Sequence, residues 1–448
     1  MAPSSLDHWI DRQRSLSLSH LKASLSATHL SHTRKAFAQT VRPACGSVLA
    51  SPVSAHWDPE PDYFYHWVRD AAIVMNAVVE VARHAKDNEE KQKWLDAFDD
   101  YIDFSLRCTE TGAVPLAENP LLAQTVSGAR QFLRTTEDIA GLNEETVLKE
   151  PRFNPDGTLD LLQWAKPQYD GPALRALTSL NYIRLSREQG RPITPQLVTL
   201  LKKDLDFTVS HADEPCIGPW EEDHEMDQHY FTSLCQLGAI YHGKEWIEGK
   251  QADAATEKLY KGLDSHWDET RGLYISLRQA RAGFDAGQFM AALHADLPGS
   301  RHSLQDPKLL KTVSAMEDYF ARAYPLNAGA ASVVIGRSER DKYFGNNPWF
   351  PTTLSLAEFY YKMAERSERF AGQYVDKAEN ILKAVLPHVP KDGSLSEQFD
   401  RASGHPVSAR HLTWSYAAFL CATQAREQAL SAPDRNNGPM PGIIPALF

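Results

Sequence analysis

Several patterns are missing from this 448-residue sequence, and each absence excludes a class of protein. No apolar run approaches the ~20 residues that a membrane-spanning helix needs, so no membrane association is expected. The sequence has no basic stripe, and its net charge of −11 argues against a nucleic-acid partner. The N-terminal residues lack a basic stretch followed by an apolar one, so no signal peptide is predicted. A secreted protein whose signal was removed is the alternative.

Cysteine and glycosylation signals are scarce as well. The five cysteines are scattered, and none forms a C-x-x-C pair that would indicate zinc. An odd number of cysteines in so long a chain does not suggest a disulfide scaffold, and no N-x-S/T site is present. These features together favour a cytoplasmic protein in a reducing compartment.

The sequence is rich in helical periodicity from end to end, while strand-like alternation is scarce. The apolar residues of 70–85 fall on one stripe with a period of 3.6 residues. Thr194 is expected to cap a helix that begins at Pro195. Helices are predicted at residues 5–25, 70–85, 90–108, 171–188, 195–209, 229–242, 251–265, 305–323, 351–367, 370–387 and 409–428.

The length of the chain exceeds the ~250–300 residues of a usual single core. Helix pairs, however, can be stacked without a new core for each pair. We therefore expect a single all-α domain over residues 1–430, followed by an extended tail at 431–448 that is rich in Pro and Gly.

Aromatic, Arg and carboxylate residues gather in five loops, each of which precedes a predicted helix. If inner and outer helices alternate around a barrel, the five loops meet on one rim. The loops read PDYFYHWVRD, QWAKPQYDGP, PWEEDHEMDQHYF, RDKYFGNNPWFP and SLSEQFDRASGHPVSAR.

The third loop, residues 219–231, holds five carboxylates and two histidines. His224 and His229 are one residue further apart than in the H-E-x-x-H zinc motif, so on a helix they would point about 140° apart. No metal site is therefore expected. For the other acidic side chains of the loop, we expect a solvated surface; these are Asp223, Glu225 and Asp227.

Two carboxylates in separate loops suggest acid–base chemistry. Trp220 next to Glu221 can supply an apolar wall, which raises the pKa of a carboxyl and keeps it protonated as a proton donor. A second acidic loop holds Glu397. Glycosidic cleavage needs such a pair, one to protonate the leaving oxygen and one to activate water or attack directly. Aromatic residues that can stack on sugar rings lie in or beside these loops: Trp67, Trp164, Trp220, Trp349 and Trp414.

The motifs DYFYHWVRD, DGPALRA, PWEE, NPWF and SEQFDRASGHPVSARHLTWSYAA resemble the glucoamylase family (glycoside hydrolase family 15), especially its fungal-type catalytic domains. The resemblance runs from about residue 47 to 428. It implies an (α/α)6 barrel and no cofactor. It also implies an exo-acting, inverting α-glucosidase that releases β-D-glucose from non-reducing ends of α-glucans or short malto-oligosaccharides.

Individual roles follow from the same resemblance. It implies that Glu221 is the general acid and Glu397 the base that polarises water. Arg69 and Asp70 would hold the terminal sugar, and Ser408 would hydrogen-bond the base. From its position Ser408 also fits an N-cap of the last helix, and both roles can hold. The resemblance also implies that substrate is bound by Tyr63, Trp67, Trp164, Glu222 and Arg337. The loop positions of Trp220, Trp349 and Trp414 make these residues candidates as well. Asp170 and Arg175 are interpreted as structural, as a helix cap and an ion pair.

The sequence also departs from the family pattern. The loop after PWEE is about two residues longer and more acidic, which suggests a narrowed pocket mouth and a preference for di- and trisaccharides. No starch-binding domain is expected after the barrel. The partner expected is therefore an oligosaccharide or α-glucan, bound by a monomer. A hydrolase of isomalto-oligosaccharides or trehalose is the alternative activity, and a non-catalytic glycan-binding protein is the alternative class.

Overall fold

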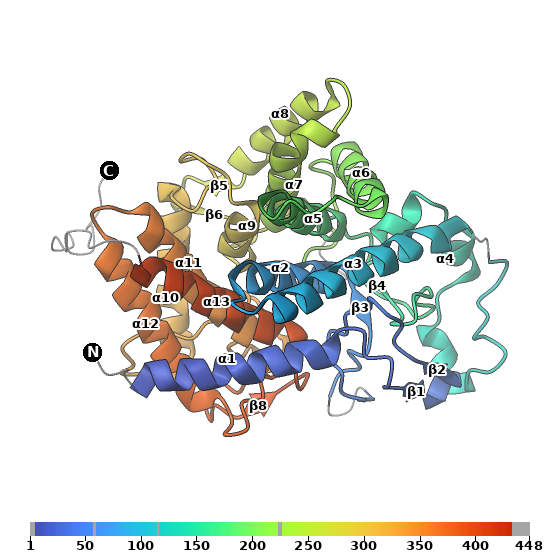
Figure 1. Cartoon of the computed structure of the whole chain (residues 1–448), viewed down its shortest axis with the longest axis horizontal. Coiled ribbons are helices and arrows are strands. Elements are labelled where there is room, and N and C mark those ends of the chain that lie inside the picture. The colour runs from blue at the N-terminus through green and yellow to red at the C-terminus, as the bar shows by residue number, and fades with distance from the viewer. Residues whose placement is uncertain (1–4, 57–59, 114–115, 223–225, 432–448) are drawn as a thin grey trace.

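The computed structural model describes residues 5–56, 60–113, 116–222 and 226–431. Apart from the five-residue α4 (Thr136–Ala140), its α-helices alternate along the chain between an outer and an inner ring (Figure 1). The inner ring is formed by α2 (Val68–His84), α5 (Asp170–Glu188), α7 (Tyr230–Gly243), α9 (Gly287–Ala295), α11 (Phe350–Arg366) and α13 (Thr413–Ser431). Each of these contacts the next, and α13 closes the ring on α2.

The outer helices each cover one inner helix. They are α1 (Ser5–Ser24), α3 (Asn88–Glu110), α6 (Pro195–Ser210), α8 (Gln251–Asp264), α10 (Pro307–Ala323) and α12 (Ala371–Val385). In the same order they pack against α13, α2, α5, α7, α9 and α11. This arrangement confirms the predicted (α/α)6 barrel. None of the helices in the described part of the chain is both long and apolar enough to cross a membrane.

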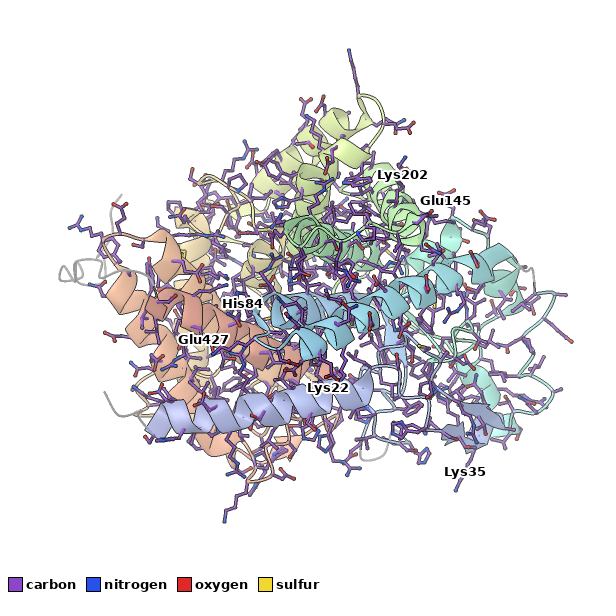
Figure 2. The ribbon with its side chains drawn as sticks, viewed as in Figure 1. Lys22, Lys35, His84, Glu145, Lys202 and Glu427 are labelled. Carbon is purple, nitrogen blue, oxygen red and sulfur yellow. The ribbon has the colours of Figure 1, made fainter. Side chains whose placement is uncertain are left out.

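Sequence pattern explains which ring a helix joins. The outer α10 buries a single stripe that includes Leu309, Val313, Met316 and Phe320, as expected of an amphipathic surface helix. The inner α5 and α13 are buried nearly all round over their N-terminal halves. Between the helices, side chains fill the barrel (Figure 2).

The predicted helix positions are largely confirmed. Thr194 caps α6 by accepting a hydrogen bond from the backbone N–H of Leu197 at 3.3 Å, and Pro195 is the first helical residue. The helix α9 was not predicted, because its nine residues are buried on nearly every side and show no amphipathic stripe. The last helix begins at Thr413 rather than at 409, so Ser408 cannot be its N-cap.

Four short antiparallel strand pairs connect the helices in the described ranges. They are β1 (His32–Arg34) with β2 (Gln39–Val41), β3 (His66–Trp67) with β4 (Arg152–Phe153), β5 (Trp267–Asp268) with β6 (Leu273–Tyr274), and β7 (Gln398–Phe399) with β8 (Pro406–Val407). In the second pair Trp67 lies opposite Arg152, and in the fourth Gln398 lies opposite Val407. These two pairs directly precede or follow residues of the candidate site.

Candidate functional site

A small pocket lies at the N-terminal ends of the inner helices, where the predicted loops meet. Its volume is about 50 Å³. It brings together side chains from loops more than 300 residues apart in the sequence, as the barrel interpretation predicted. We call it the carboxylate pocket; its lining residues are Tyr63, Trp67, Arg69, Asp70, Pro219, Trp220, Glu221, Arg337, Trp349, Glu397, Leu412 and Trp414.

Four N–H groups surround the carboxyl of Glu221. Its Oε1 accepts hydrogen bonds from Trp67 Nε1 at 2.9 Å, Arg69 Nη2 at 3.0 Å and Gln168 Nε2 at 3.0 Å. Its Oε2 accepts one from Trp164 Nε1 at 2.7 Å. Oε1 is therefore fully occupied, so a proton on this carboxyl would sit on Oε2, the oxygen with a free lone pair.

The backbone of Glu221 is held in an uncommon conformation. Its φ of 61° lies in the left-handed region, which costs a non-glycine residue roughly 1 kcal/mol. Strain of this kind concentrates at functional sites. The surroundings of Glu221 differ from the sequence expectation, since the indole N–H groups of Trp67 and Trp164 reach its carboxyl, whereas Trp220 uses its own N–H elsewhere.

Arg69 lies in a cluster of buried charges behind Glu221. It is 4% exposed and forms ion pairs with Asp170 at 3.1 Å, Glu221 at 3.0 Å and Asp70 at 3.5 Å. Asp70 lines the pocket within the first turn of α2. Burial raises the pKa of the Asp70 carboxyl to about 6, against the opposing effect of Arg69.

Two residues interpreted as structural have definite partners. Asp170 is the first residue of α5, not its cap, because Tyr169 occupies the capping position. Its carboxylate pairs with Arg69. Arg175 forms the predicted ion pair inside the barrel, with Asp204, through two hydrogen bonds of 2.8 and 2.7 Å.

Hydroxyl groups surround the second carboxyl, Glu397. Ser408 donates a short hydrogen bond to its Oε2, and Tyr63 donates to its Oε1 at 3.2 Å. The Tyr63 hydroxyl is also 3.0 Å from that of Tyr343. Glu397 is 3% exposed, and this burial raises its pKa to about 7; Ser408, Arg337 and Tyr63 act in the opposite direction.

An aromatic wall closes another side of the pocket. Trp220 lies nearly parallel to Trp414, with ring centroids 6.3 Å apart, and edge-on to Trp349 at 5.8 Å. The Nε1 of Trp220 donates to both carboxylate oxygens of Asp285, at 2.8 and 2.7 Å. Asp285 therefore fixes the orientation of this indole from the loop before α9.

Arg337 is buried at the pocket and is not a surface charge. It is 4% exposed, forms a bidentate ion pair with Asp341, and donates to Glu222 at 3.2 Å. Its guanidinium lies 4.8 Å from the ring centroid of Trp349. Glu222 is only partly buried, so its carboxylate remains accessible beside the pocket.

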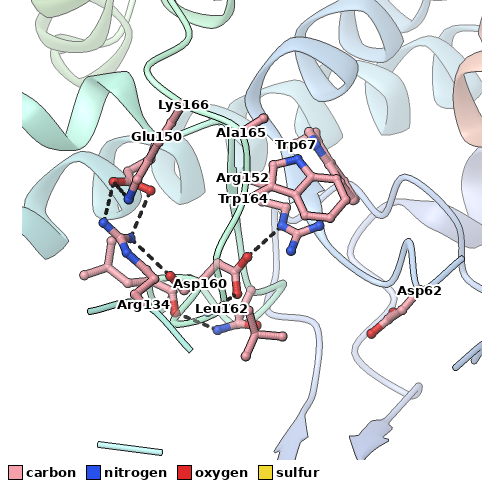
Figure 3. A network of polar contacts seen from close by, with 12 residues as sticks. Asp62, Trp67, Arg134, Glu150, Arg152, Asp160, Leu162, Trp164, Ala165 and Lys166 are labelled. Atoms are coloured by element: carbon pink, nitrogen blue, oxygen red, sulfur yellow. Dashed lines mark hydrogen bonds and ion pairs between the residues drawn. The ribbon is translucent and has the colours of Figure 1, made fainter. Parts of the chain in front are cut away.

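A stack of cationic and aromatic side chains supports Trp164 from behind. The Arg152 guanidinium carbon lies 3.6 Å from the ring centroid of Trp164 and 4.0 Å from that of Tyr65. Arg34 lies on Tyr65 at 3.8 Å. Arg152 also donates to Asp160 at 2.7 Å, as Figure 3 shows. This stack therefore links the β1–β2 hairpin to the indole that contacts Glu221. Its members, in order, are Arg34, Tyr65, Arg152 and Trp164.

The acidic loop after Glu222 is only partly described. Asp223 and Glu225 lie outside the described residues, as does His224. The expectation of a solvated side chain is wrong for Asp227, which is 3% exposed. Its carboxylate accepts hydrogen bonds from the backbone N–H groups of Gln279 and Ala280. Asp227 therefore joins two loops and does not narrow the pocket mouth.

All the substrate-binding residues suggested by the sequence either line this pocket or contact a residue that lines it. Trp164, Glu222 and Ser408 belong to the second group. Sequence reasoning missed four contributors: Gln168, Asp285, Asp341 and Tyr343. Tyr343 and Asp341 had a signal, as an aromatic residue and a carboxylate in one of the five loops. Among the described residues, no group of three or more His, Cys, Asp or Glu side chains is arranged to hold a metal ion.

The burial of Glu397 predicts a pH dependence. If Glu397 must be ionised to activate water, kcat/KM falls as the pH drops through the pKa of this carboxyl. We expect the midpoint of this acidic limb above the ordinary value of 4.5, towards 7. Replacing Ser408 by Ala should move the limb to higher pH, because the Ser408 hydroxyl stabilises the charged form. Initial rates from pH 3 to 9 test both statements. A limb unmoved by Ser408→Ala would contradict the assignment.

The chain is similar to proteins of a known family. The sequence profile of Glycosyl hydrolases family 15 matches residues 29–112 and 118–424. A probable glucoamylase of Schizosaccharomyces pombe is 29% identical over 467 residues, covering 94% of this chain and 92% of the relative. The intracellular, sporulation-specific glucoamylase of Saccharomyces cerevisiae is 24% identical, covering 96% and 86%.

Solved structures share the fold. The family 15 glucoamylase from Hypocrea jecorina matches with a TM-score of 0.74 at 24% identity, covering 95% of this chain and 73% of that one. The glucoamylase from Saccharomycopsis fibuligera matches with a TM-score of 0.73 at 22% identity, covering 96% of both chains. Because the family profile spans most of the sequence, this chain belongs to glycosyl hydrolase family 15.

Proposed function

We propose that this protein is an exo-acting, inverting α-glucosidase of the glucoamylase type, with Glu221 as general acid and Glu397 as general base. One observation carries the assignment of roles: both carboxyl groups line a single pocket although 176 residues separate them in the sequence. The relatives named as glucoamylases support the activity. A protein that only binds glycans would not need a paired acid and base.

The geometry around Glu221 suits the carboxylate that remains after proton transfer. When its proton passes to the glycosidic oxygen, a carboxylate is left behind. Four N–H groups already point at this carboxyl, among them the cationic Arg69. Charge-assisted and preorganised donors stabilise such a developing charge without further rearrangement.

Glu397 then acts on water. As a carboxylate it takes a proton from a water molecule, which attacks the anomeric carbon on the face opposite the leaving group. Tyr63 and Ser408 hold the two oxygens of Glu397 and so fix the direction of its free lone pairs. Attack from the opposite face inverts the configuration, so an α-linked glucan yields β-glucose.

The stereochemistry of the first product tests this mechanism. We expect proton NMR, recorded during the first minutes of maltose hydrolysis before mutarotation, to show the anomeric signal of β-glucose. Inverting enzymes separate their two carboxyl groups by ~6.5–9.5 Å to leave room for water. A first product with the α configuration would overturn the roles given to Glu397 and to water.

A substrate panel separates the proposed activity from its alternatives. Glucose release is measured from maltose, soluble starch, isomaltose and trehalose at equal concentration of glucosidic bonds. The highest kcat/KM on an α-1,4-linked substrate supports the proposal. The highest value on isomaltose or trehalose would instead support the alternative activity. No release from any of them would favour a binding protein.

We further propose that the protein works as a monomer in a reducing compartment. The five cysteines are unpaired, and Cys108, Cys216 and Cys235 are buried. Light scattering of the purified protein and microscopy of a tagged chain test the two statements; a stable dimer or a secreted product would contradict them.

A further inference from the structure

A second, larger cavity lies outside the carboxylate pocket. Its volume is about 710 Å³, and it is bordered by the β1–β2 hairpin, the 3₁₀ helix η3 (Ser127–Phe132) and residues 162–164. None of the residues that line it also lines the carboxylate pocket. We call it the hairpin cavity. Its size is within the ~300–1,000 Å³ of sites that enclose small organic ligands, so it is large enough for a ligand of its own.

Aromatic side chains line the hairpin cavity, namely Phe37, Phe132 and Trp164. Phe132 is 55% exposed, although phenylalanine is normally buried. Val126 is also 55% exposed, and its backbone N–H binds the carbonyl of Ala36, which lines the cavity. Exposed apolar surface of this kind beside a cavity is typical of a binding site. An occupant with an apolar, planar body would cover it.

The charged groups of the hairpin cavity leave one positive charge without a partner. Arg34 and Arg152 line the cavity and pair with Asp62 and Asp160, each at 2.7 Å. Lys35 lines it too, is exposed, and forms no ion pair with any residue that the structure describes. Figure 2 shows Lys35 at the edge of the molecule. In a chain with a net charge of −11, this local excess of positive charge favours an anionic ligand over a neutral or cationic one.

Arg152 also has an unused hydrogen-bond donor. The side chain is 2% exposed, and its Nε donates to Asp160 (Figure 3). Its buried Nη1 has no hydrogen-bond partner among the described residues. Stacking on Trp164 and Tyr65, at 3.6 and 4.0 Å from the ring centroids, fixes the position of the guanidinium. A fixed guanidinium N–H is best satisfied by the oxygen of an anion, because charge-assisted hydrogen bonds are stronger than neutral ones.

Apolar rings, one uncompensated positive charge and one unused guanidinium N–H together define a class of ligand. We propose that the hairpin cavity binds a small organic anion, a planar apolar ring system that carries one carboxylate, sulfonate or phosphate group. The rings pack against Phe37 and Phe132, the anionic oxygens accept from Arg152, and Lys35 attracts the charge at the rim. Binding of this kind does not depend on the proposed glucosidase activity.

Two fluorescent probes with the same rings test the requirement for charge. Anilinonaphthalenesulfonate carries a sulfonate, whereas N-phenylnaphthylamine is its neutral counterpart, and both fluoresce brightly only in apolar surroundings. Titration of the protein with each probe gives the Kd and the stoichiometry. We expect a single sulfonate probe per chain, bound at least ~10-fold more tightly than the neutral probe because of its charge-assisted bond to Arg152. Benzoate should displace the sulfonate probe, and benzyl alcohol should not.

Exposed side chains of the hairpin cavity can be replaced without disturbing the core. Phe132→Ala should raise the Kd of the sulfonate probe about fivefold, through loss of an aromatic contact. Lys35→Gln should raise it about threefold, an effect that high salt removes. Leu122→Ala and Lys202→Gln are the matched controls, because both residues are exposed and neither lines the cavity; their Kd should equal that of the wild type.

Arg152→Lys keeps a positive charge opposite Asp160 but lacks the second nitrogen, so it should raise the Kd about tenfold. Thermal melting shows whether this variant folds; if it does not, the two exposed positions decide. Equal affinity for the two probes would overturn the proposal, because the cavity would then bind apolar rings without regard to charge. A Kd unchanged in both Phe132→Ala and Lys35→Gln would overturn it too, since the probe would lie elsewhere. Displacement of the probe by maltose would place it in the carboxylate pocket, with the same consequence.

Discussion

Replacing Glu221 by Gln is expected to lower kcat at least ~100-fold, because proton transfer to a leaving group contributes ~10²–10⁴ to a rate. Glutamine has the shape of glutamate but has no proton to give. The amide oxygen can take the place of Oε1 and accept from Trp67, Arg69 and Gln168. Its NH2 group would then face the N–H of Trp164, donor against donor.

That second effect distinguishes Glu221 from a residue that merely fills space. The displaced Trp164 should change the intrinsic tryptophan fluorescence, since the indole loses its carboxylate partner. Glu145→Gln serves as the matched control, because Glu145 is an exposed carboxyl (Figure 2) that does not line the pocket. Initial rates on maltose and maltoheptaose give kcat. Turnover within a factor of about three of the wild type would remove Glu221 from the role of proton donor.

The fold was largely predictable because its main signal is local. A stripe of period 3.6 needs only a short stretch of sequence, and outer helices such as α10 carry one. The helix α9 did not, because the closed inner ring buries it on nearly every side. The alternation of inner and outer helices also predicted that the loops lie on one rim of the barrel. Residues far apart in the sequence, such as Tyr63 and Glu397, could therefore be expected to lie in contact.

The finer structure of the site depends on contacts that leave no local pattern. Gln168 is a neutral amide in one of the five loops, and its residue type gives no sign of a role until Glu221 lies 3.0 Å away. The two-residue strands β3 and β4 are too short to show alternation, yet their pairing brings Arg152 onto Trp164.

Asp227 shows the converse error, in which a local pattern misleads. Five acidic residues within a stretch of thirteen suggest side chains exposed to solvent, since charged groups are seldom buried alone. Asp227 is buried because backbone N–H groups of the 276–282 turn satisfy its carboxylate. Sequence composition cannot report a partner that is some fifty residues away.

Replacing Glu397 by Gln should also lower kcat at least ~100-fold, through loss of the base that activates water. Here the partners are hydroxyls and not N–H groups. Ser408 and Tyr63 each carry an oxygen that can accept as well as donate, so both can rotate to bond an amide. We therefore expect this variant to keep the wild-type pocket and to bind substrate with little change in Kd.

The stability of the same variant should move in the opposite direction to its activity. Burial raises the pKa of Glu397 to about 7 from an ordinary value of 4.5. Between these values the unfolded chain releases a proton that the folded chain retains, so this carboxyl makes stability fall as the pH rises. The full cost, at most about 3 kcal/mol, is present above pH 7 and absent below pH 4.5.

Glutamine cannot ionise and does not carry this cost. Glu397→Gln should therefore unfold at a higher temperature than the wild type at pH 8, while the two melt together at pH 4. Calorimetry at both pH values, beside maltose turnover at pH 7, gives the complete test. An inactive variant that is also less stable at pH 8 would show that the loss of rate comes from a damaged pocket. An inactive variant with the expected gain would show that the fold retains an unfavourable buried carboxyl for its chemistry.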